Sequence, residues 1–75
     1  MNIRDYEIEI RRHAFIRAMQ KGIHPDMIES TIKLGKIEKH GKNNVKFVKK
    51  FKKFTVVCVD EIVRNKIKIV TIGKR

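Results

Sequence analysis

Acidic residues are scarce in this sequence, where eight Asp and Glu stand against 19 Lys and Arg among 75 residues. The formal net charge is therefore +11 with neutral histidines, and such a field attracts polyanions at long range. Nucleic acid is the polyanion that we expect as a partner, with RNA ahead of DNA.

Cysteine is nearly absent as well, because Cys58 is the single thiol of the chain. One thiol cannot form an internal disulfide, so a reducing compartment suits the protein. The longest apolar runs, such as residues 56–59, are far shorter than the about 20 residues that a membrane span needs. The charged residues near the N-terminus also leave no apolar stretch for a signal peptide. We expect a cytoplasmic protein that makes no membrane contact.

Linkers rich in Gly, Ser or Pro are missing, and so are internal repeats, which predicts one continuous domain over residues 1–75. Apolar and charged residues alternate at positions 7–11 and indicate a short opening strand. From Arg12 the apolar residues follow a helical period instead, with Phe15, Ala18 and Met19 on one side. Gly22 is placed to end this first helix.

A second helix is predicted over residues 25–34. Pro25 is favoured at a first helical position, and the apolar residues that follow keep helical spacing up to Gly35, which is expected to stop the helix. Ile23 and Ile28 flank the helix start at the spacing of a hydrophobic staple.

The remaining chain has the pattern of strands. Residues 36–40 alternate, residues 41–44 carry turn chemistry, and residues 45–51 alternate again. Residues 54–59 are apolar on both faces, which predicts a central strand that extends towards residue 63. After a turn, residues 67–72 form the last strand. The expected fold is α+β, in the order β-α-α-β-β-β-β, with two helices on one face of a curved antiparallel sheet.

The positive charge is concentrated between residues 33 and 53, where nine lysines and one acid, Glu38, supply +8 of the +11. We expect contacts with RNA phosphates from five lysines of the predicted hairpin: Lys42, Lys46, Lys49, Lys50 and Lys53. The alternative is that lysines of this segment only solvate the surface.

Phenylalanines are interleaved with these lysines at positions 47, 51 and 54. This combination is typical of surfaces that stack bases while neutralising phosphates. The alternative, which we favour for two of the three, is that the rings belong to the core, because so small a domain needs its large apolar side chains inside.

Histidine at position 13 begins a stripe of the first helix that continues with Arg17 and Lys21, four residues apart each time. An imidazole can accept or donate a proton near neutral pH, while adjacent cations can hold a phosphate. These groups suit metal-free cleavage of RNA by the 2′-hydroxyl. The spacing is also that of ordinary solvated residues opposite an apolar face, and it leaves both interpretations open.

The other histidines and the cysteine point to structure rather than chemistry. His24 lies at a helix cap, His40 beside a turn, and Cys58 inside an apolar strand, where a thiol acts as a small hydrophobe. Their spacing matches no zinc-ligand pattern, and no glycine-rich phosphate loop is present. We therefore expect no metal and no cofactor.

The residues Arg12-His13-Ala14-Phe15-Ile16-Arg17, followed by Lys21-Gly22-Ile23 and a second helix from Pro25, resemble the prokaryotic domain-of-unknown-function family 4258. The likeness covers most of the chain, with its recognisable motif in residues 12–35. That family is grouped with RelE-like and colicin-like ribonuclease toxins. The resemblance implies a single RelE-like domain that acts as a metal-independent endoribonuclease, the toxin of a type II toxin–antitoxin pair, with an acidic antitoxin as its partner.

By the same resemblance, the family's helix histidine falls on His13 and its following basic residue on Arg17. Lys21 stands where the family has Arg, which keeps the charge and loses the planar guanidinium. His24 replaces a Ser or Thr cap, and Thr71 matches a threonine of the last strand. The implied catalytic set is His13, Arg17, Lys21 and Thr71. The competing interpretation is a non-catalytic nucleic-acid-binding module that uses the basic surface of residues 33–53.

Overall fold

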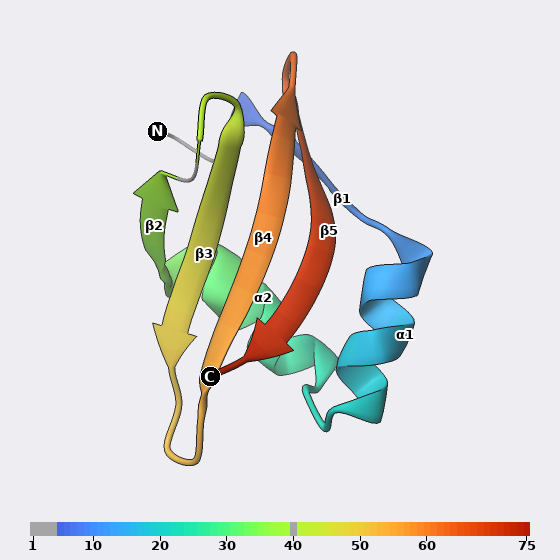
Figure 1. The fold of residues 1–75 in the computed structure, drawn as a ribbon, viewed down its shortest axis with the longest axis vertical. Helices are drawn as coiled ribbons and strands as arrows, with labels where there is room; N and C mark the ends of the chain where they lie inside the picture. The colour runs from blue at the N-terminus through green and yellow to red at the C-terminus, as the bar shows by residue number, and fades with distance from the viewer. Residues whose placement is uncertain (1–4, 40) are drawn as a thin grey trace.

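The structure, a computed structural model, describes residues 5–39 and 41–75. Two helices and five strands follow one another along the chain (Figure 1): β1 Glu7–Ile10, α1 Arg12–Gln20, α2 Pro25–Leu34, β2 Lys36–Lys39, β3 Asn44–Lys50, β4 Thr55–Val63 and β5 Lys66–Lys74. The chain is thus α+β, and the bounds of α2 agree with those that the sequence predicts. Within the described residues, no helix is long and apolar enough to span a membrane.

The strands form one open sheet in the order β1-β5-β4-β3-β2, with β4 at its centre as expected. The expectation of a purely antiparallel sheet is wrong, because β1 runs parallel to β5, with Glu7 opposite Lys66 and Ile10 opposite Ile69. The other three strand pairs are antiparallel. Side-chain alternation is the same in both kinds of pairing, so it carries no information on the direction of a strand whose partner is distant in sequence.

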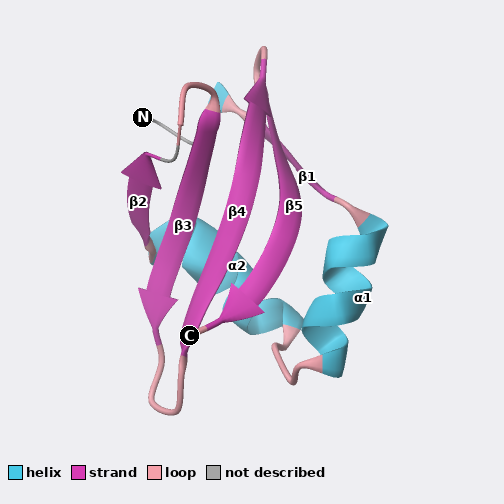
Figure 2. Cartoon of the chain, viewed as in Figure 1, coloured by secondary structure: helices cyan, strands magenta, loops and turns pink. Residues whose placement is uncertain are grey.

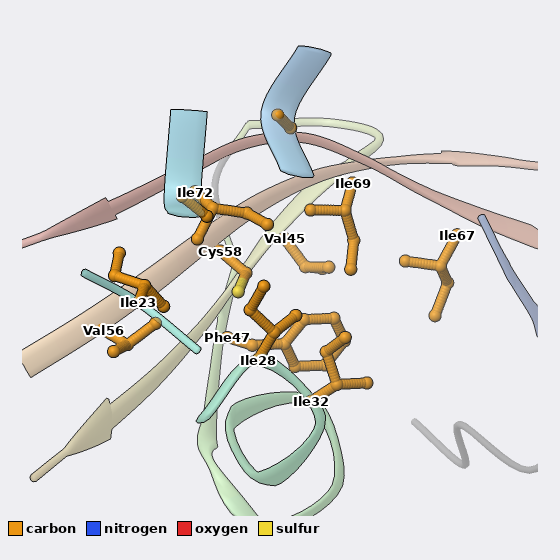
Figure 3. Close-up of a cluster of buried hydrophobic side chains, with 12 residues drawn as sticks. Ile23, Ile28, Ile32, Val45, Phe47, Val56, Cys58, Ile67, Ile69 and Ile72 are labelled. Atoms are coloured by element: carbon orange, nitrogen blue, oxygen red, sulfur yellow. The ribbon is translucent and has the colours of Figure 1, made fainter. Parts of the chain in front are cut away.

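The helices lie on one side of the sheet and leave the other side uncovered (Figure 2). Helix α2 packs against β3 and β4, and α1 packs against β5. Alternate residues of β3 and β4 and three isoleucines of β5 point towards the helices (Figure 3). The resulting core consists of Ala14, Ala18, Ile23, Ile28, Ile32, Val45, Phe47, Val56, Cys58, Ile67, Ile69 and Ile72. The uncovered side is called the open face below.

The end of α1 is shaped by Gly22, as the sequence predicts. Gly22 has a φ of +78°, its N–H donates to the carbonyl of Met19 at 3.1 Å, and the N–H of Ile23 donates to the carbonyl of Ala18 at 2.9 Å. This pair of bonds is a Schellman motif, in which glycine is favoured because it has no Cβ. The motif turns Ile23 into the core, where Ile28 is also buried, consistent with the predicted staple.

Gly35 also ends its helix as predicted, for a different physical reason. Its φ of −71° is open to any residue. A Cβ at this position would lie 2.9 Å from the carbonyl oxygen of Val48 and closer still to that of Thr31. Glycine is therefore needed because the end of α2 approaches the backbone of β3.

Strand β5 extends two residues beyond its predicted end and contains an irregularity. Thr71 lies opposite Val59, whereas Ile69 lies opposite Asp60, so Val70 is an extra residue without a direct partner. This bulge resets the alternation of β5. Because Ile72 is buried on the helix side, Thr71 is directed to the open face, where it is exposed.

Candidate catalytic and RNA-binding site

The side chains of His13, Arg17 and Lys21 form an exposed stripe along α1. Ala14 and Ala18 are buried and hold the helix against β5, which leaves the stripe beside that contact. One helical step of four residues rises by about 6 Å, so the three groups extend over about 12 Å. Within the described residues, no side chain hydrogen-bonds to His13 or Arg17, and both are free to meet a ligand.

Lys21 joins the C-terminal end of this stripe to the end of β5. Its Nζ lies 3.5 Å from the carbonyl oxygen of Ile72 and 3.9 Å from the point where a Cβ on Gly73 would stand. In return, Nζ of Lys74 donates to the carbonyl oxygen of Lys21 at 2.7 Å. Two residues that are 51 positions apart in sequence thus meet at one corner of the molecule.

Thr71 lies on the same strand as this corner and on the same face as Gly73. Thr71 stands opposite Val59 and Gly73 opposite Val57, and both partners are on the open face. The structure therefore places Lys21 and Thr71 at the same end of β5. It places Arg17 one turn and His13 two turns from Lys21, towards the start of α1.

The five lysines expected to contact RNA do not share one surface. Lys46 and Lys50 lie on the open face, because Val45 and Phe47, on the alternate positions of β3, are buried on the helix side. Lys49 has the opposite direction, and its Nζ hydrogen-bonds to the hydroxyl of Ser30 on α2. The alternation of side chains along β3 thus places Lys49 and Lys50, which are neighbours in sequence, on opposite faces of the sheet.

Lys42 and Lys53 lie at the two ends of β3. Lys42 precedes β3, near β2, and Lys53 lies in the turn that leads to β4 (Figure 1). Both are exposed. Of the five predicted RNA-binding lysines, Lys49, Lys50 and Lys53 thus lie near the β3–β4 turn. Lys42 and Lys46 lie towards the other end of β3.

The three phenylalanines have two kinds of environment. Phe47 is fully buried and belongs to the core. Phe51 and Phe54 are half-buried at the base of the β3–β4 turn, with ring centroids 6.5 Å apart. Nζ of Lys49 lies 5.2 Å from the ring centre of Phe51, and Nζ of Lys74 lies 4.9 Å from that of Phe54. Lys74 lies beyond the predicted end of the last strand, so its place over Phe54 could not be predicted from the local pattern.

Acidic groups neutralise few of the cations in the described part of the chain. The one ion pair found there joins Lys33 to Glu29 at 2.7 Å, and both side chains are exposed. The hydrogen bond and charge of Lys33 lower the pKa of Glu29. No acid occurs in residues 39–59 or 62–75, so the cations of β3, β5 and the turn between β3 and β4 have no acidic neighbours in sequence.

Two titratable groups are buried in the core on β4. Cys58 is fully buried, as expected, and burial raises the pKa of its thiol to about 12, which makes it inert. Asp60 was not expected there: it is fully buried, and neither carboxylate oxygen has a hydrogen-bond partner in the described structure. Burial raises the pKa of Asp60 to about 8. The alternation of Val56, Cys58 and Asp60 was the signal that could have predicted its position.

Other parts of the described structure offer no alternative centre for chemistry. His24 is the N-cap residue of α2 without a side-chain cap bond, and His40 lies outside the described residues. A groove of about 340 Å³ between β1, α1 and α2 is mostly apolar, and none of the predicted catalytic residues lines it. Among residues 5–39 and 41–75, no cluster of three His, Cys, Asp or Glu could hold a metal ion.

Comparison with known proteins identifies no relative: no protein-family model, curated protein or solved structure matches the chain.

Proposed function

We propose that the chain is a metal-independent endoribonuclease with a RelE-like fold, in which His13 transfers a proton while Arg17 and Lys21 bind the scissile phosphate. The observation that carries this proposal is the contact of Lys21 with the carbonyl of Ile72, which joins the basic stripe of α1 to the C-terminal end of β5. A phosphate bound beside α1 at the end of β5 would meet two cations, Arg17 and Lys21. The likeness to family 4258 supports the same assignment.

The proposed reaction needs one proton acceptor and one proton donor. His13 takes the proton of the 2′-hydroxyl, the 2′-oxygen attacks phosphorus, and the bond from phosphorus to the 5′-oxygen breaks as that oxygen receives a proton from solvent water. The protonated His13 then returns its proton to the solvent. The products are a 2′,3′-cyclic phosphate and a 5′-hydroxyl. Arg17 and Lys21 stabilise the extra negative charge on the phosphate oxygens in the transition state.

Replacing His13 tests the proposal directly. The wild-type protein, incubated in EDTA with single-stranded and structured RNA, is expected to leave cyclic phosphate ends. H13A is expected to reduce the rate by about 10²–10⁴-fold, the contribution of a general acid or base. The exposed side chain makes little contact with the core, so the variant should fold normally, which circular dichroism checks. Cleavage at the wild-type rate by H13A would refute the assignment.

The proposed biological setting is a cytoplasmic toxin that an acidic antitoxin neutralises. The net charge of +11 with a single ion pair in the described residues supports this choice, because an acidic partner gains from the same field as RNA. Induced expression of the wild type should then arrest bacterial growth, and H13A should not.

A non-catalytic RNA-binding module is the second candidate. The rings of Phe51 and Phe54 with their lysines favour it, since such groups bind RNA without any chemistry. This candidate predicts salt-sensitive binding with no cleavage products at any protein concentration. The cleavage assay with wild-type protein distinguishes the two.

A further inference from the structure

We infer that the turn between β3 and β4 is a binding subsite for single-stranded RNA, in which bases stack on Phe51 and Phe54 and the surrounding amines bind the flanking phosphates. This inference rests on the proposed function for its choice of RNA as ligand. To the proposed function it adds the substrate class, which is unpaired RNA, and the part of the protein surface along which the RNA runs.

The turn presents two rings and two cations in four consecutive residues. The N–H of Phe51 donates to the carbonyl of Phe54 at 2.8 Å, which closes the turn and leaves Lys52 and Lys53 exposed at its tip. The ring planes are inclined by 48° and are only half-buried. Both rings pack partly against the core, but unlike the fully buried Phe47 each keeps an accessible part.

Both rings are covered by cations, one from the end of β3 and one from the end of β5. Nζ of Lys49 lies over Phe51 and Nζ of Lys74 over Phe54, at distances typical of cation–π contacts. Such contacts are individually weak, so a nucleobase can compete with an amine for the face of a ring. The displaced ammonium then remains within reach of the phosphate on either side of that base.

The subsite is continuous with the proposed catalytic corner. Lys74, which covers Phe54, also donates to the backbone of Lys21 at the end of the α1 stripe. Arg75 pairs with Thr55 through two backbone hydrogen bonds of 2.9 and 3.4 Å, which places the last residue beside the turn. An RNA strand cleaved beside α1 would thus reach the rings of Phe51 and Phe54 by following the end of β5.

Base stacking distinguishes this subsite from a simple basic patch. The probe is a 2′-O-methyl RNA of about eight nucleotides, within the site sizes of single-strand binders, which lacks the attacking hydroxyl and cannot be cleaved. The matched probe has the same backbone without bases. The wild type should bind the base-bearing strand more tightly than the abasic strand, by about tenfold or more if each stacked base contributes about 1–3 kcal/mol.

Two double variants separate the rings from the charges. F51L/F54L keeps apolar side chains in place and should lose the preference for the base-bearing strand, while its affinity for the abasic strand stays unchanged. K52Q/K53Q should weaken binding of both strands by the same factor. An unchanged preference in F51L/F54L, or equal binding of both probes by the wild type, would overturn the subsite.

Failure of the subsite and failure of the proposed function give different results. If unmodified RNA is cleaved but the probes bind alike, the subsite is wrong and the ribonuclease proposal stands. If base-dependent binding is observed without cleavage, the subsite stands and the second candidate function replaces the first. Thermal unfolding of F51L/F54L shows that the variant is folded in the assay.

Discussion

At the scale of single residues, Asp60 is the group whose surroundings conflict most with its chemistry. A buried carboxylate without hydrogen-bond partners is costly, and a protein relieves that cost by keeping the group protonated. Asp60 stands opposite Val45 and Ile69, two buried apolar residues, which offer it no polar contact. Its raised pKa follows from desolvation alone.

The stability of the fold should therefore depend on pH through Asp60. In the unfolded chain the carboxyl titrates near 3.8 and in the folded chain near 8, so between these values only the folded state holds the proton. The free energy of unfolding is then expected to fall as pH rises, by about 2–4 kcal/mol between about pH 5 and pH 8. Chemical denaturation at several pH values measures this change in the free energy of unfolding.

Two variants of Asp60 check whether this residue causes the pH dependence of stability. D60N cannot ionise and should show a flatter dependence on pH. D60V removes the buried polar group altogether and should be more stable than the wild type at pH 8, because Val suits a buried strand position. A pH dependence that persists in both variants would assign it to another group.

At the scale of secondary-structure elements, the junction between α2 and β2 shows how closely helix and sheet pack. The N–H of Gly35 bonds to the carbonyl of Thr31 at 2.9 Å, and the chain enters β2 at the next residue. The absence of a Cβ lets this backbone approach β3. The close packing at this junction thus depends on one glycine for steric reasons.

Substituting Gly35 should move the end of α2 away from the sheet. G35A is expected to lower the free energy of unfolding by about 1–3 kcal/mol, the usual cost of overpacking, because backbone atoms of Thr31 and Val48 stand where the methyl would be. G73A is the matched control, since its nearest neighbour would be a flexible amine at 3.9 Å. Equal stability of the two variants in urea denaturation would contradict the steric argument.

At the scale of the whole molecule, the positive charge is distributed over both ends of the sheet. Lysines that are neighbours in sequence reach different surfaces, and only part of the charge surrounds the β3–β4 turn. RNA that follows the proposed path would contact the lysines near this turn. Those near the β2–β3 connection would contribute only through the long-range field.

Salt dependence of RNA binding distinguishes contacting lysines from distant ones. If all five predicted lysines contacted phosphates, log affinity would fall with log salt at a slope of about −3 to −4 on single strands, and the slope is shallower if only those near the turn make contact. K50Q/K53Q should make the slope shallower by roughly 1 to 1.5 units. K39Q/K42Q removes the same charge from the other end of β3 and should leave the slope nearly unchanged. Equal slopes for both variants and the wild type would mean that these lysines are only solvated.

Much of the fold could be predicted from the sequence, because its local signals are strong. The periods of 3.6 and 2 residues located both helices and all strands, and Gly22, Pro25 and Gly35 marked helix ends that the structure confirms. The burial of Cys58 followed from its place in an apolar central strand. The excess of basic residues is likewise a property of composition and independent of the fold.

Tertiary structure alone decided which of these residues meet. The parallel position of β1, the bulge that directs Thr71 to the open face and the meeting of Lys21 with Ile72 all depend on contacts between distant segments. Alternation along β3 divided a single lysine run between two faces, and the added length of β5 brought Lys74 over Phe54. Local patterns determine elements, because backbone and side-chain preferences act over a few residues. The arrangement of the elements depends on burial and backbone pairing across the whole chain, which no short segment encodes.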